Sequence, residues 1–218
     1  MNNAAYTVER IQEGSLDITG LAEASPWDNA NELTHFVSLW DDKPIKPITF
    51  KALYDETYLY FSFVVLDDSI YIQLNDDSKE SIAQSDRVEL FLRPDESLSP
   101  YYCLEIDTQP RIMDFKAMPN RDFDLKWNWP KDEIQVKSAI LEGKFIVEGK
   151  ITLNSLKTLN LIKGGSFGRF MEVGVYRAKY NPDSAGHFQP TWITWGDPNT
   201  PEPDFHIPSS FGIFRFRS

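Results

Sequence analysis

The chain has 218 residues, of which 41% are hydrophobic and 14% aromatic, so it is not a disordered chain. Acidic residues outnumber basic residues by 33 to 22, and the net charge of -11 opposes binding to nucleic acid or anionic lipid and favours neutral or cationic partners. A single cysteine, Cys103, excludes an internal disulfide and a thiolate metal cluster.

The length favours one domain over residues 1–218, because β-sandwiches of this size commonly fold without splitting. No apolar stretch approaches the length of a membrane span, so membrane insertion is not expected. The opening residues, MNNAAYTVER, lack the pattern of a signal peptide. Removal of an earlier signal would place the protein outside the cell or in the periplasm, and otherwise it is cytoplasmic, so the compartment stays open.

Short runs of alternating apolar and polar residues, separated by Gly, Pro, Asn and Asp, predict an all-β sandwich or barrel with long loops and little helix. The predicted strands cover residues 7–11, 33–39, 48–54, 58–66, 87–93, 101–107, 112–117, 134–141, 145–152, 169–179, 193–195 and 212–216. A short helix is expected at 153–159, capped by Asn154 or Ser155. Hairpin turns are expected at 55–57 and 142–143, and long loops at 67–84 and 109–131.

The segment 85–107 reads SDRVELFLRPDESLSPYYCLEID and predicts an antiparallel hairpin. One face carries Val88, Leu90 and Leu92, with Tyr102, Leu104 and Ile106 as their candidate partners. The opposite face carries the charged residues Arg87, Glu89, Glu105 and Asp107. Carboxylates and a guanidinium group suit the paired hydroxyls of a sugar, but the same pattern also fits a solvated sheet face with an Arg–Glu pair.

Aromatic side chains supply the flat surfaces on which the apolar faces of sugars stack. Trp127 and Trp129 follow an acidic loop, and Trp192 and Trp195 flank the ITW segment. Trp195 is the favoured stacking residue, because Gly196, Asp197 and Pro198 place it where a strand enters a Pro-rich loop that holds Phe205 and His206. Arg177 and His206 are further candidate ligand-binding residues.

Other chemistry has weaker support in the sequence. Paired carboxylates also permit a glycoside hydrolase that draws its acid and base from Glu89, Glu105 and Asp107. No GxSxG or HExxH motif is present, and the three histidines have no recognisable metal-ligand spacing. The acidic stretches at 67–68 and 75–77 do not match the twelve-residue calcium loop. No cofactor is therefore required.

Four ordered segments resemble the family 9 carbohydrate-binding modules. They are KALYDETYLYFSFVVLDD, SDRVELFLRP with YYCLEID, EGKFIVEGKITL, and TWITWGDP followed by FHIPSSFGIFRF. The resemblance implies a jelly-roll-like antiparallel β-sandwich that binds sugars without catalysis. It also implies a structural calcium ion and, in several architectures, a neighbouring xylanase or other glycoside hydrolase.

In that family the sugar lies between two Trp side chains. Trp195 matches the second of these, and Glu89 matches the acidic residue that bonds sugar hydroxyls. Glu105 stands where the better-known members have Arg, and residues 81–84 (SIAQ) stand where the first Trp is expected. Trp127 or Trp129 is the candidate substitute for that missing Trp.

The sequence therefore supports three hypotheses. The first is non-catalytic binding of an oligosaccharide or polysaccharide such as xylan or cellulose, in support of polysaccharide degradation. The second is a glycoside hydrolase. The third is a structural or protein-interaction sandwich, which predicts a packed Trp195 and no cleft beside Glu89.

Overall fold

The computed structural model describes residues 4–165 and 168–217, which form thirteen strands and five short helical segments. The strands are β1 (Ala5–Arg10), β2 (Ile48–Tyr54), β3 (Tyr58–Leu66), β4 (Arg87–Arg93), β5 (Tyr101–Asp107), β6 (Ile112–Met118), β7 (Asp122–Asp124), β8 (Ile134–Leu141), β9 (Lys144–Thr152), β10 (Lys163–Gly165), β11 (Gly168–Pro182), β12 (Phe188–Thr194) and β13 (Gly212–Phe216). The helices are α1 (Lys79–Ala83) and α2 (Leu153–Thr158), with 3-10 turns η1 (Ser25–Asn29), η2 (Pro119–Arg121) and η3 (Pro208–Ser210).

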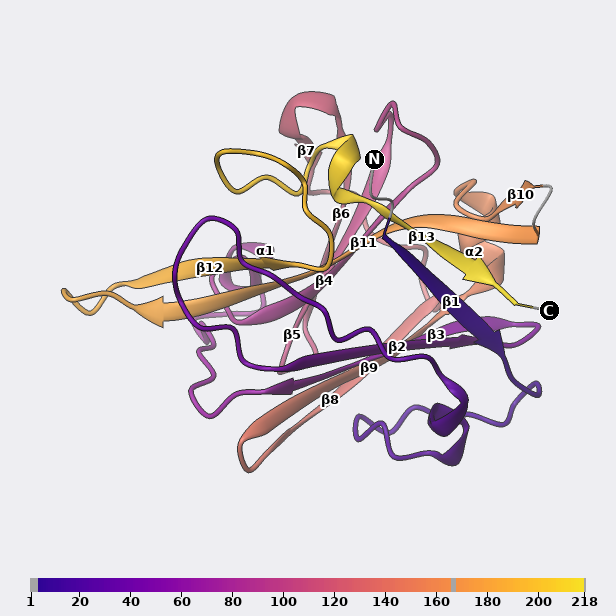
Figure 1. Cartoon of the computed structure of the whole chain (residues 1–218), viewed down its shortest axis with the longest axis horizontal. Coiled ribbons are helices and arrows are strands. Elements are labelled where there is room, and N and C mark those ends of the chain that lie inside the picture. The colour runs from indigo at the N-terminus through magenta and orange to yellow at the C-terminus, as the bar shows by residue number, and fades with distance from the viewer. Residues whose placement is uncertain (1–3, 166–167, 218) are drawn as a thin grey trace.

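The strands form two layers that pack face to face, as Figure 1 shows. Sheet A has the order β7-β6-β5-β4-β11-β13, with β10 and β12 also paired to β11, and sheet B has the order β2-β3-β9-β8. Strand β1 joins the layers, because its first half pairs in parallel with β13 and its end pairs in parallel with β2. The predicted all-β sandwich is confirmed. The strand pairs are antiparallel as predicted, except that both pairings of β1 are parallel, so the sheet is mixed.

Most predicted strands are confirmed within one to three residues, but the strand expected at 33–39 is wrong. This segment is irregular and makes isolated bridges from Leu33 to Phe50 and from Val37 to Thr194. The strand expected at 193–195 instead covers Phe188–Thr194 and pairs along β11 as a long hairpin. Leu33 and Phe36 of this segment thus pack against the core without joining a ladder.

The predicted short helix is confirmed as α2, although its cap is Thr152, whose side chain accepts a hydrogen bond from the Ser155 N–H. Helix α1 is a difference from the sequence prediction, because it lies in the predicted loop 67–84. Its cap is Ser78, which accepts a hydrogen bond from the Ser81 N–H in the manner typical of a helix N-terminus. The predicted loop 109–131 contains β6, η2 and β7.

Alternation along β4 and β5 directs one set of side chains into the core between the layers. The pairs Val88 with Ile106, Leu90 with Leu104, and Leu92 with Tyr102 match the sequence prediction. All six side chains belong to the main hydrophobic core. Full burial of each aliphatic side chain stabilises the fold by about 1.5–3 kcal/mol, so this register is strongly favoured over a one-residue shift.

The opposite face of β4 and β5 is also buried. Every residue of both strands is buried, so this is not a solvated sheet face. A second apolar cluster covers it and includes Phe91, Tyr101, Phe115, Tyr176 and Phe205. The covering segments come from α1, from β6 and the chain after it, and from the segment between β12 and β13, and they enclose the site described below.

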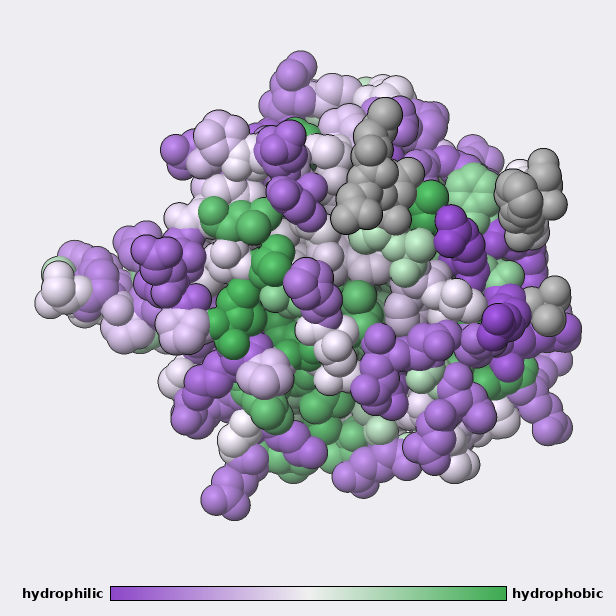
Figure 2. All heavy atoms as spheres, viewed as in Figure 1, coloured by the Kyte–Doolittle hydropathy of each residue, from purple (hydrophilic) through white to green (hydrophobic). Residues whose placement is uncertain are grey.

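The face drawn in Figure 2 is mostly polar, which agrees with the high charge of the chain. In Figure 2 apolar side chains gather left of centre, in the region that the segment between η1 and β2 crosses in Figure 1. Leu33, Phe36 and Ile45 of that segment pack against the main core. Within the described ranges, no helix has both the length and the apolar character needed to cross a membrane.

Candidate functional site

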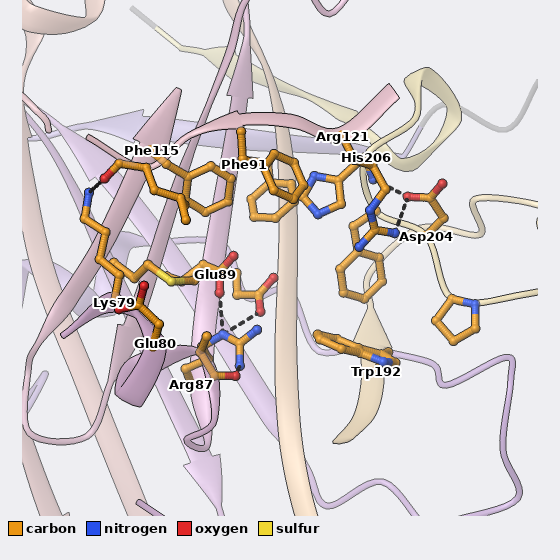
Figure 3. A pocket seen from close by; sticks show the side chains of 17 residues that line it. Lys79, Glu80, Arg87, Glu89, Phe91, Phe115, Arg121, Trp192, Asp204 and His206 are labelled. Atoms are coloured by element: carbon orange, nitrogen blue, oxygen red, sulfur yellow. Dashed lines mark hydrogen bonds and ion pairs between the residues drawn. The ribbon is translucent and has the colours of Figure 1, made fainter. Parts of the chain in front are cut away.

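A cavity of about 270 Å³ lies on the outer face of sheet A. Residues from β4, β5 and β6 form its floor, α1 borders one side, and β12 with the segments 119–125 and 203–206 forms the rest (Figure 3). Ligand pockets commonly measure about 300–1,000 Å³, so this cavity suits a small ligand or one end of a longer one. It lies directly beside Glu89, where the purely structural hypothesis expects no cleft.

Arg87, Glu89 and Glu105, here called the pocket cluster, form the charged part of the floor. Glu89 and Glu105 are direct cross-strand partners, as the sequence predicts. Arg87 Nε donates a hydrogen bond to Glu105 Oε2 at 2.5 Å and lies 3.0 Å from Glu89 Oε1. Its Nη1 donates to the Ala83 carbonyl at the end of α1. One guanidinium group therefore serves two carboxylates.

The two carboxylates of the pocket cluster lie in a dry environment. Glu89 is 1% exposed and Glu105 is 4% exposed. Burial raises the pKa of Glu89 to about 8, with a further contribution from the Glu105 charge that Arg87 only partly offsets. Burial also raises the pKa of Glu105, against the opposing effect of Arg87. The pair therefore tends to retain a proton near neutral pH.

Glu89 has unused hydrogen-bonding capacity. Its Oε1 atom is buried but, within the described part of the chain, has no hydrogen-bond partner, because the nearby Arg87 N–H is directed to Glu105. Buried polar atoms are rarely left without a partner, and leaving one unpaired costs about 1–3 kcal/mol. A bound ligand with a donor group would satisfy this atom.

Aromatic side chains form the wall opposite this floor. Trp192 is half-buried in β12, and its ring meets Phe205 edge-on at 5.8 Å and 87°. Phe205 in turn stacks on Tyr176 at 4.1 Å and 5°. The Arg87 guanidinium lies 5.6 Å from the centre of the Trp192 ring, so the aromatic wall and the charged floor border the same space (Figure 3).

His206 and a loop ion pair form the rim. His206 Nδ1 shares a 2.8 Å hydrogen bond with the Tyr101 hydroxyl, and its ring lies 5.0 Å from Phe91. Burial lowers the pKa of His206 to about 3, helped by the positive charges of Arg121 and Arg87. The exposed Arg121 lies 3.7 Å from Asp204. The sequence prediction that His206 belongs to the ligand site is consistent with its position on this rim.

Trp195 does not line this cavity but belongs to the lining of a second one, of about 820 Å³, with Glu172 and Asp197. It is 4% exposed, belongs to the main core and packs edge-on against Phe214 at 5.8 Å. Its neighbour two residues earlier, Ile193, is also in the core, whereas Trp192 projects from the opposite face of the strand. The expectation of an exposed stacking residue at Trp195 is therefore corrected. Successive residues of a strand point to opposite faces, so the three-residue spacing of Trp192 and Trp195 in TWITW predicts that the two tryptophans lie on opposite faces.

Trp127 and Trp129 also lie outside the cavity lining. Trp129 is buried in the main core, and its indole N–H donates to Ser155 Oγ at 3.1 Å. Trp127 is half-buried and packs against Tyr102 with ring centres 5.0 Å apart. These residues close one end of the sandwich and do not supply a second stacking surface in this cavity.

Asp107 shares the polar face of β5, but both of its carboxylate oxygens accept hydrogen bonds within the turn that follows the strand. It accepts hydrogen bonds from the backbone of Gln109 and from the backbone and side chain of Arg111. The close contact of the Arg111 guanidinium at 2.7 Å completes a local ion pair. Asp107 therefore stabilises the β5–β6 connection and does not line the cavity.

Arg177 faces the core and belongs to a second buried ionic group, here called the core cluster. Its members are Asp67, Asp86, Arg177 and Lys179. Arg177 pairs with Asp67, and Lys179 bridges Asp67 at 3.2 Å and Asp86 at 2.7 Å. Burial acts to raise the pKa of Asp67, but hydrogen bonds from Ser69 and the two cations outweigh it, so the pKa lies below its ordinary value. Arg177 is thus part of the core and not of the cavity.

The resemblance noted in the sequence implies a structural calcium ion. Among the described residues, no three His, Cys, Asp or Glu side chains converge as a metal-ligand set. The side chains therefore do not fit such a site.

The two-layer fold defines a β-sandwich, and its cavity combines aromatic and carboxylate groups. The chain belongs to the Carbohydrate family 9 binding domain-like family, which matches residues 18–217. No curated protein matches the chain.

Three solved structures share the fold. A protein described as a candidate carbohydrate-binding protein from Bacteroides uniformis has a TM-score of 0.77 at 15% identity, with 99% of this chain and 100% of that chain covered. A family 9 carbohydrate-binding module from Caldicellulosiruptor kristjanssonii in complex with glucose has a TM-score of 0.65 at 19% identity, with coverage of 99% and 96%. The same description with cellotriose applies to a third structure, at 0.65, 20% identity, and coverage of 99% and 95%. At these identities the similarity shows the fold.

Proposed function

We propose that this chain binds the end of an oligosaccharide or polysaccharide in the cavity, without catalysis. Trp192 supplies the surface on which a sugar ring stacks, and Glu89 and Glu105 accept hydrogen bonds from its hydroxyl groups. The observation that carries the proposal is the buried Glu89 Oε1, which shares the Arg87 cation with Glu105 but accepts no hydrogen bond from the described residues, across the cavity from an aromatic wall. Family membership supports the same assignment.

The affinity is expected to be modest. A cavity of this size receives one sugar ring or little more, and the cost of desolvating its polar groups offsets much of the gain. Dissociation constants of about micromolar to millimolar are typical of such sites. Association with glycoside hydrolases, in support of polysaccharide degradation, is a further part of the proposal that rests on the family resemblance alone.

The test is calorimetric titration with cellotriose, xylotriose and mannotriose. Trp192→Ala should weaken the best of these ligands about tenfold or more, because it removes the stacking surface. Trp127→Ala is the matched control, since Trp127 is half-buried outside the cavity lining and its loss should leave affinity unchanged. Absence of binding to all three sugars, or equal losses in the two variants, would refute the proposal.

A glycoside hydrolase is the second candidate, and the raised pKa of Glu89 favours it, because a general acid must hold its proton at working pH. The arrangement of Arg87 opposes it. Glu89 and Glu105 contact the same Arg87 nitrogen, whereas a glycosidase places its two carboxyl groups on opposite sides of the scissile bond. Product analysis with the same sugars decides, since turnover that is lost in Glu89→Gln would favour the enzyme.

A further inference from the structure

The cavity carries more negative than positive charge at its floor. Arg87 is shared by Glu89 and Glu105, which leaves one carboxylate without a cation of its own. The other cations of the wall are already paired, Lys79 with Asp114 at 3.1 Å and Arg121 with Asp204 at 3.7 Å. Glu80 of α1, which also lines the cavity, has no ion-pair partner in the described ranges. The residues that line the cavity therefore include more carboxylates than unpaired cations that could neutralise them.

A buried charge without a partner is strongly disfavoured, and a protein normally neutralises it with a proton or a cation. The pair of Glu89 and Glu105 meets this condition, since two buried carboxylates share the single cation of Arg87 and Glu89 Oε1 accepts no hydrogen bond from the described residues. In the free protein a proton fills this role, in agreement with the raised pKa of Glu89. A ligand that brings its own positive charge can replace that proton.

We propose that the cavity selects a sugar with a free amine, whose ammonium group binds on the cavity side of Glu89 and Glu105, beside the Arg87 contact that the two carboxylates share. The inference rests on the proposed function and names its ligand class as unacetylated amino sugars and their β-linked oligomers. An ammonium group donates up to three hydrogen bonds, and its charge strengthens each one. A neutral hydroxyl group at the same position leaves the negative charge uncompensated.

Two other features of the chain favour a cation. The net charge of -11 attracts positively charged ligands over a distance. Trp192 and Phe205 offer ring faces and edges beside the carboxylates, where a desolvated cation is attracted to an aromatic face. Acetylation of the amine removes its charge and adds bulk in a cavity of only about 270 Å³, so the acetylated sugar should bind worse.

The titratable groups around Glu89 come from three strands. They are Arg87 on its own strand, Cys103 and Glu105 on β5, and Tyr176 and Tyr180 on β11. Burial raises the pKa of the thiol and of both hydroxyls, so these groups keep their protons near neutral pH. A proton released when a cation binds must therefore come from the carboxylate pair.

The first test compares three trimers with the same β-1,4 linkage, which differ only at the second carbon of each sugar. Cellotriose carries hydroxyls, the glucosamine trimer carries ammonium groups, and the N-acetylglucosamine trimer carries neutral amides. Titration at about pH 6.5, where such an amine is largely protonated, should show the glucosamine trimer binding about tenfold tighter than the other two. The preference should shrink as salt is added.

A second measurement on the unmodified protein detects whether the carboxylate pair releases a proton when the amine binds. Titration of the glucosamine trimer in two buffers of different ionisation enthalpy should reveal release of up to one proton, because Glu89 with a pKa of about 8 is mostly protonated at this pH. Cellotriose should release none. Glu105→Gln should lower the ratio of glucosamine-trimer affinity to cellotriose affinity about tenfold, whereas Glu142→Gln, in an exposed turn, should leave that ratio unchanged.

The outcomes separate this inference from the proposed function. Equal or tighter binding of cellotriose, or amine binding without proton release, overturns the selection for amines and leaves carbohydrate binding intact. Failure of all three trimers to bind refutes both. Since the three trimers are compared on the unmodified protein, the amine preference can be measured even if Glu105→Gln is unstable.

Discussion

The two buried ionic clusters lie on opposite faces of the same sheet, and they differ in how their charges are balanced. In the core cluster, Asp67 and Asp86 meet two cations, and every carboxylate oxygen has a partner, although Arg177 leaves its Nε unpaired among the described residues. In the pocket cluster, two carboxylates share one cation, and a buried oxygen is left over. Burial is therefore not what distinguishes a binding site from a structural ion pair. The unfilled acceptor is the distinguishing feature.

The largest effect should come from breaking the balanced cluster. Asp67→Ala leaves the buried Arg177 without its partner and should lower the free energy of unfolding by about 3–5 kcal/mol, measured by urea denaturation. Asp68→Ala is the matched control, because its side chain is 70% exposed and pairs with Lys46, and it should cost less than about 1 kcal/mol. Equal losses would show that burial of the core cluster has no energetic role.

The unbalanced cluster should respond in the opposite direction. The pKa of Glu89 is raised to about 8, so the native state holds a proton that the unfolded chain loses near its ordinary value, and stability should fall as pH rises from about 4.5 to 8. Glu89→Gln removes this charge and should be about 1–2 kcal/mol more stable than the unmodified protein at pH 8, but not at pH 5. Denaturation at both pH values measures the difference, and a constant offset would contradict it.

His206 gives an effect with the reverse sign. Its pKa is lowered to about 3, so on acidification the unfolded chain takes up a proton near pH 6.5 while the native ring stays neutral. Stability should therefore fall below about pH 6.5, by up to about 2 kcal/mol at pH 5, and His206→Gln should lose this dependence. If the variant and the unmodified protein lose the same stability on acidification, His206 is not held neutral by the pocket.

The smallest effect is expected at the rim. Arg121 is exposed, and its contact with Asp204 spans 3.7 Å, so Arg121→Ala should change stability by less than about 0.5 kcal/mol. Sugar affinity should change less than about threefold, because the floor and the aromatic wall are untouched. A large loss of sugar affinity in the same calorimetric titration would contradict this expectation and would show that the Arg121–Asp204 ion pair contacts the sugar.

The sequence predicts the floor of the site but not its cover. Period-2 alternation gives the β4–β5 register and places Arg87, Glu89 and Glu105 together, because strand periodicity is a local property. The cover comes from segments far along the chain, such as 203–206, whose packing has no local pattern. For that reason the sequence leaves a solvated sheet face open as an alternative, which the burial of every residue of β4 and β5 excludes.

The choice of Trp195 over Trp192 fails for a related reason. The prediction relies on the loop that follows Trp195, whereas the alternation of β12 places Ile193 and Trp195 together on the core side. Arg177 is misassigned because the same alternation on β11 directs it inward, toward an aspartate that the sequence places 110 positions away. Charge alone does not show which face of a strand a residue occupies.

Strand β1 has a consequence for the order of events in folding. It pairs with β13 at Ala5 and Ile213, near opposite ends of the described chain, and it also carries Tyr6 into contact with Phe214 at 5.2 Å. During synthesis β1 can meet β2 early, but it must wait for almost the whole chain to emerge before β13 arrives. The pairing of β1 with β13 can therefore form only after the segments that line the cavity have been synthesised. Contacts so distant in sequence slow folding, and they leave one side of β1 open to wrong partners until the last strand is made.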